Sequence, residues 1–233
     1  MLKKLKKELR SLANPKIAEH ARRFFKTGKG EYGEGDQFIG IRVPVLRSLA
    51  KKYHHLPAAQ SLELLTSPLH EERMLALFLL IQSYKKENDR GKKWIHKQYL
   101  KHTSCINNWD LVDCSAEHIV GAYLADKSRK KLNLLAKSKN LWERRISIIS
   151  TFRFIKMEEY EDTLNISKIL LYDPEDLIHK ATGWMLREIG KRDFKTAEVF
   201  ILEYGNMMPR TMLRYALEKF PEEKRRKYMK MRT

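Results

Sequence analysis

The stretch NNWDLVDCSAEHIV, from Asn107 to Val120, sets two carboxylates beside an indole ring in a chain whose formal net charge is +18. If this stretch is helical, Trp109 and Asp113 are four residues apart and project from the same face, one turn above the other. An aromatic plate and a carboxylate would then share one site. The chemistry open to such a pair is the binding or stabilisation of a cation.

Ordinary packing is the competing explanation for each of these residues. The tryptophans Trp109, Trp142 and Trp184 all fit a buried core, and Asp110 is expected to cap the N-terminus of its helix. Asp113 would lie inside that helix, where capping cannot explain it and an ion pair with Arg145 could. The combination therefore favours a functional site over packing alone.

Other motifs carry less chemistry. The segment HEERM begins like a zinc-protease motif at His70 but has Met74 where the second histidine is required, so no metal site is expected. The segment from Thr27 to Pro44 holds five of the ten glycines and spells GxGxxG from Gly28 to Gly33. No strand precedes it, so we predict no dinucleotide cofactor and expect residues 28–40 to form a flexible loop.

Composition limits the class of protein and of partner. Lys and Arg number 47 against 29 Asp and Glu, which gives an electrostatic field that attracts polyanions, most commonly nucleic acid. The longest apolar run, from Met74 to Ile81, is too short to span a membrane, so no membrane partner is expected. Two cysteines are too few for a disulfide framework, which predicts a reducing, cytoplasmic location.

Helical spacing dominates from Leu62 onward, and strand-like alternation is almost absent. Five predicted helix starts recur at separations of 37, 35, 35 and 34 residues, near the period of helical-pair repeats. We therefore predict one all-α helical-repeat domain over residues 1–233, a solenoid with a concave basic groove that suits duplex DNA. Its basic side chains would be Arg73, Arg145, Lys180, Arg187 and Arg214.

Four segments, in this order and at these distances, carry a resemblance: FIGIRVPVLRSLA, NNWDLVDCSAEHIVGAYL, LWERRISIISTF and HKATGWMLREIGK. Together they closely resemble the AlkD-type DNA alkylation repair glycosylases, a family of HEAT-like helical repeats, and the likeness covers nearly the whole chain. It implies that the active site consists of Trp109, Asp113, Arg145 and Trp184. Arg42 and Arg47, from the first segment, join the predicted DNA contacts.

The resemblance implies a cofactor-free, monomeric enzyme that excises cationic alkylated purines, such as 3-methyladenine and 7-methylguanine, from duplex DNA. The damaged base would stay stacked, whereas most glycosylases extrude it. Two other functions stay open at this point. One is a non-catalytic DNA-binding or structure-sensing member of the same family, and the other is a helical scaffold whose basic surface binds acidic proteins.

Overall fold

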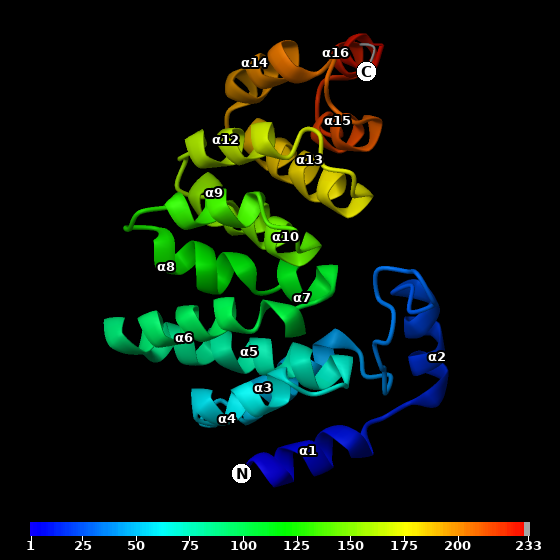
Figure 1. The fold of residues 1–233 in the computed structure, drawn as a ribbon, viewed down its shortest axis with the longest axis vertical. Helices are drawn as coiled ribbons and strands as arrows, with labels where there is room; N and C mark the ends of the chain where they lie inside the picture. The colour runs from blue at the N-terminus through cyan, green and yellow to red at the C-terminus, as the bar shows by residue number, and fades with distance from the viewer. Residues whose placement is uncertain (231–233) are drawn as a thin grey trace. The chain divides into compact units, whose positions relative to one another are not determined.

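A computed structural model describes residues 1–230, which are mainly helical and divide into two compact units. The first unit is Met1–Ser115, and the second begins at Ala116 (Figure 1). The predicted all-α, helical-repeat class is confirmed. The prediction of a single domain over 1–233 stays a prediction, because one continuous repeat array can also divide into compact units.

In the first unit, helices gather around one long central helix, α5. Helices α3, α4 and α6 each pack against α5, and the short helix α7 also contacts it. The elements are α1 (Leu2–Ser11), α2 (Pro15–Phe24), α3 (Val43–Lys52), α4 (Ala58–Leu65), α5 (His70–Lys86), α6 (Asp89–Lys101), the 3-10 turn η1 (Thr103–Cys105) and α7 (Trp109–Asp113).

Helix α5 is buried around most of its circumference. Its apolar run from Met74 to Ile81 has no polar face, which is the pattern of a core helix enclosed by neighbours. The burial extends to the charged first turn, where the residues from His70 to Arg73 are all at most 5% exposed. Charged groups buried in this way need partners, and the loop before α3 supplies several of them.

The glycine-rich segment that links α2 to α3 is a loop, as predicted, but its second half is held firmly. The buried carboxylate of Glu71 accepts hydrogen bonds from the backbone amides of Ile39, Gly40 and Ile41, the shortest being 2.7 Å, to Gly40. Gly40 has φ +82°, and a Cβ there would lie 2.1 Å from the carbonyl oxygen of Asn14. Only glycine fits this close approach of loop and helix.

The second unit repeats one packing relation. Helix α10 packs against α13, and α13 packs against α15, while α9, α12 and α14 cover these helices from their neighbouring positions in the chain. The elements are the π-helical turn η2 (Glu117–Gly121), α8 (Ala122–Leu124), α9 (Lys130–Ala136), α10 (Leu141–Ser150), α11 (Phe152–Ile155), α12 (Glu161–Ile169), α13 (Asp176–Gly190), α14 (Phe194–Tyr204), α15 (Arg210–Ala216) and α16 (Glu222–Tyr228).

The periodic helix starts predicted from the sequence are confirmed. The five reference positions fall within the first two turns of α5, α7, α10, α13 and α15. Within the second unit, the three successive reference helices α10, α13 and α15 are also successive neighbours in space (Figure 1). This arrangement is what stacked helical repeats require, because each repeat buries its apolar face against the next.

Candidate functional site

Helix α7 brings together two of the predicted catalytic residues. Trp109 is its first residue and Asp113 its last, so both project from one face, one turn apart. Both residues are half-buried. The helix starts at the cap Asn108, whose side-chain oxygen accepts a hydrogen bond of 2.8 Å from the amide of Trp109.

The prediction that Asp110 caps this helix is wrong. Asn108 occupies the cap position, and Asp110 lies in the first turn. The side chain of Asp110 instead turns to α5, where its Oδ2 lies 2.9 Å from Nε2 of His70. The side chain of Asp110 is 14% exposed, so this pair lies at the edge of the protein interior.

Around His70, the charges alternate from one partner to the next. The Nδ1 of His70 lies 2.7 Å from Oδ2 of Asp36, and Arg73 donates a hydrogen bond of 2.6 Å to the other oxygen of Asp36. Burial alone would lower the pKa of His70, but the hydrogen bonds to Asp110 and Asp36 outweigh it and raise that pKa to about 9. Burial opposes ionisation of Asp36, yet His70 and Arg73 hold the pKa of its carboxyl below the ordinary value. Each of these side chains thus contacts one of opposite charge, and we call this chain of ion pairs, formed by Arg73, Asp36, His70 and Asp110, the charge relay.

Two phenylalanine rings and a tyrosine hydroxyl hold the indole of Trp109 in place. The indole stacks on Phe25 with ring centroids 5.3 Å apart, and Phe24 meets it edge-on at 5.9 Å. Its Nε1 donates a hydrogen bond of 3.3 Å to the hydroxyl of Tyr32 in the glycine-rich loop. Phe38 continues the series, since it stacks on both Phe25 and the ring of His70. The orientation of Trp109 is therefore set by packing that reaches the charge relay.

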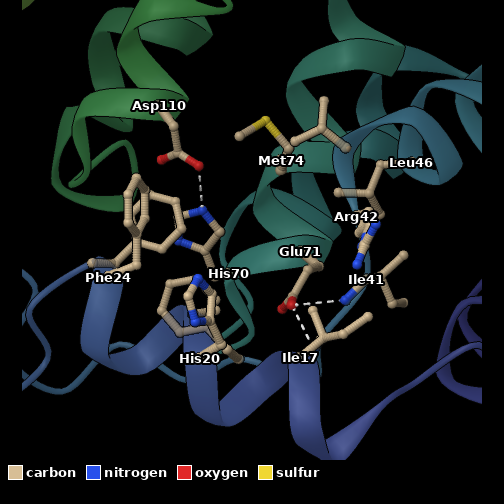
Figure 2. Close-up of a pocket in the computed structure, with 15 residues that line it drawn as sticks. Ile17, His20, Phe24, Ile41, Arg42, Leu46, His70, Glu71, Met74 and Asp110 are labelled. Atoms are coloured by element: carbon tan, nitrogen blue, oxygen red, sulfur yellow. Dashed lines mark hydrogen bonds and ion pairs between the residues drawn. The ribbon is translucent and has the colours of Figure 1, made fainter.

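A cavity of about 230 Å³ opens beside the charge relay, between α2, the glycine-rich loop and the start of α5 (Figure 2). Its walls are mostly apolar, with Phe24 and Ile17 from α2, Leu46 from α3 and Met74 from α5. Figure 2 shows the bonded pair of His70 and Asp110 in its wall, and Arg42 at the side near α3. The cavity thus reaches α7 through the side chain of Asp110.

The other two predicted catalytic residues lie in the second unit, on the adjacent helices α10 and α13. Arg145 of α10 is only 4% exposed, and its guanidinium donates a hydrogen bond to the carbonyl of Leu177. Trp184 of α13 is half-buried, and its Nε1 donates a hydrogen bond of 3.2 Å to Glu188. The assembly of these two residues with Trp109 and Asp113 into one active site stays a prediction.

One predicted DNA contact does not fit its surroundings. Arg73 is 5% exposed, and its guanidinium is committed to Asp36, to Asn107 and to the carbonyls of Ser67 and Pro68. A buried guanidinium with this many partners cannot reach a phosphate without breaking them. Arg73 is therefore part of the framework of the first unit, not of a DNA-binding surface.

The remaining predicted DNA contacts are either exposed or paired with a carboxylate. Arg42, Arg47 and Arg214 are exposed, and the guanidinium of Arg47 lies over the ring of Phe78 at 4.4 Å. Lys180 forms an ion pair of 2.7 Å with Asp176 on its own helix, and Arg187 is paired with Glu218. The concave basic groove stays a prediction.

Comparison with known proteins decides the family. The sequence model of the DNA alkylation repair enzyme family matches residues 5–220. The chain belongs to that family. Repair of alkylated DNA is therefore its role, with DNA as the substrate, and the resemblance to AlkD-type proteins is confirmed.

A solved structure supports the fold of this DNA alkylation repair family member. The chain is similar to a predicted DNA alkylation repair enzyme from Enterococcus faecalis, with a TM-score of 0.69 and 18% sequence identity. The match covers 90% of this chain and 97% of the other. No curated protein matches the sequence significantly. Among residues 1–230, no helix is both long enough and apolar enough to span a bilayer.

Proposed function

We propose that this protein is a DNA glycosylase that hydrolyses the N-glycosidic bond of cationic alkylated purines in duplex DNA, as the first step of base excision repair. Substrates of the 3-methyladenine and 7-methylguanine type would be released without extrusion of the base from the helix. The observation that carries the proposal is the pairing of Trp109 with Asp113 on one half-buried face of α7, in a chain of the DNA alkylation repair family.

The chemistry of the substrate matches this pair. An alkylated purine carries a positive charge and leaves as a neutral base, so no strong general acid is needed, in contrast to ordinary glycoside hydrolysis. Positive charge grows on the deoxyribose as the bond stretches. Asp113 would stabilise that charge and orient the attacking water, while the indole face of Trp109 would hold the cationic sugar.

Arg145 and Trp184 enter the proposal through the family resemblance. Trp184 would supply a second indole face, and Arg145 would keep Asp113 ionised and hold a phosphate next to the lesion. The burial of Arg145 at 4% exposure favours the first of its two roles, because its guanidinium has little surface to offer a phosphate. Arg42, Arg47, Lys180, Arg187 and Arg214 would contact the DNA backbone, with the exposed Arg42, Arg47 and Arg214 the readiest to do so.

The decisive experiment measures release of free base from a duplex that carries a single 7-methylguanine. Wild-type protein should release the base, and Asp113→Asn should slow single-turnover release about 100-fold, the scale of losing one preorganised electrostatic group. The affinity for the same duplex should stay within about twofold, because base release and backbone binding use different groups. Asp89→Asn, an exposed change in the first turn of α6, is the matched control.

Each outcome has a clear reading. Unchanged base release by Asp113→Asn would remove this carboxylate from the mechanism. DNA binding without base release by the wild-type protein would instead support a non-catalytic, structure-sensing member of the family. If even binding at low ionic strength were absent, the DNA-directed function would fail, because contacts to phosphates strengthen as salt is lowered.

A further inference from the structure

The charge relay joins the glycine-rich loop to α7, the helix that carries Trp109 and Asp113. His70 bonds to Asp36 of the glycine-rich loop through Nδ1 and to Asp110 of α7 through Nε2. Both partners are carboxylate oxygens, which only accept hydrogen bonds, so both ring nitrogens must carry hydrogen. The ring is therefore an imidazolium, and it donates in two directions at once.

Helix α7 needs such an external tie. It has only five residues, and helices this short are not stable without tertiary contacts. Leu111 and Val112 anchor one side of α7 in the core, where both are fully buried. The bond from His70 to Asp110 anchors the first turn on the α5 side, next to Trp109 and three residues before Asp113.

His70 is in turn held rigidly. Its ring stacks on Phe38 with centroids 4.4 Å apart, and its partner Asp36 is fixed by Arg73 at 2.6 Å. The neighbouring carboxylate of Glu71 fastens the same loop through three backbone amides. A donor with so little freedom can set the position of the group that it bonds, which is how surrounding residues hold an active site in its productive geometry.

We propose that His70 is a positioning residue, whose bond to Asp110 fixes α7 and thereby holds Trp109 and Asp113 in their working orientation. This inference rests on the proposed glycosylase function for its kinetic consequence, but not for its structural one. The charged or titratable groups that face His70 are Asp36 from the loop, Asp110 from α7, Glu71 and Arg73 from α5, Arg42 before α3 and His20 from α2.

Two substitutions separate the two bonds of His70. The amide of Gln reaches about as far as Nε2, so His70→Gln can still donate to Asp110, whereas the shorter Asn of His70→Asn can replace only the bond to Asp36. If the bond to Asp110 positions α7, His70→Gln should keep most of the rate of base release. The rate of His70→Asn should fall about 10-fold to 100-fold, the scale of a misplacement near 1 Å, with duplex affinity within about twofold.

Hydrogen exchange supplies a readout that does not need catalysis. The amides of α7 should exchange faster in His70→Asn than in His70→Gln, while the amides of α6 stay protected in both. Glu8→Gln, which breaks an ion pair of the same unit between α1 and Lys52, is the matched control and should leave α7 unchanged.

These measurements can overturn the proposal and can separate it from the glycosylase function. If His70→Asn kept both the wild-type rate and the wild-type protection of α7, the positioning role would be overturned. If the wild-type protein released no base, the glycosylase proposal would fail, and the exchange of α7 alone would decide the role of His70.

Discussion

Raising the pH should destabilise the folded protein through one side chain, His70. Burial by itself would lower the pKa of this ring, but hydrogen bonds to Asp110 and Asp36 raise it from 6.5 to about 9. A folded-state pKa above the unfolded one means that the stabilisation is fully present below about pH 6.5 and is lost as the pH rises through about 9. The gap between the two pKa values corresponds to about 3 kcal/mol, at about 1.4 kcal/mol per unit.

Urea unfolding at about pH 6 and about pH 9.5 measures this loss. Other groups also titrate over this interval, so the informative quantity is the difference in free energy of unfolding between the wild-type protein and His70→Gln. That difference should shrink by about 3 kcal/mol between the two pH values. His55→Gln, at an exposed histidine, should follow the wild-type protein at both. Equal pH dependence in the wild-type protein and His70→Gln would refute the assignment of a buried imidazolium.

Two further predictions follow from the loop and from the arginines. Gly40→Ala should lower the free energy of unfolding by about 2 kcal/mol, because its Cβ would meet the carbonyl of Asn14, whereas Gly30→Ala, also at positive φ but with open space around it, should cost less in the same urea titration. Arg42→Gln should weaken duplex binding and reduce the salt slope by about one, while Arg73→Gln should lower stability and leave that slope unchanged. Fluorescence anisotropy with a labelled duplex at several salt concentrations distinguishes the two arginines.

The helices and their period could be predicted because both depend on local patterns. Apolar spacing marks each helix, and the recurring starts from α5 to α15 follow from one packing solution used repeatedly. The prediction of Asp110 as the cap of α7 was wrong because the sequence offers Asn107, Asn108 and Asp110 within four positions. All three residue types suit a cap, and sequence patterns place the end of a helix only to within a few residues.

The charge relay could not be predicted from local patterns. Arg73 looked like a surface cation, but its burial depends on Asp36, which lies 37 positions earlier in the chain. A signal was present nevertheless. The apolar run after His70 has no polar face, and a helix enclosed on all sides also buries its first turn, so the charges there require partners from elsewhere.

The buried charges beside α7 are explained better by the positioning of this helix than by the stability of the fold. A buried ion pair is often no more stabilising than well-packed apolar side chains of similar size, so stability alone does not favour Asp36 and His70 at this place. The stabilisation by the imidazolium is the difference between a charged and a neutral His70 in a fold that already places the carboxylates of Asp36 and Asp110 beside the ring. A hydrogen-bonded ring does what an apolar one cannot, because its bond fixes both the distance and the direction of Asp110. Because Asp113 lies three residues after Asp110 on the same short helix, a bond that fixes Asp110 also fixes the position of Asp113.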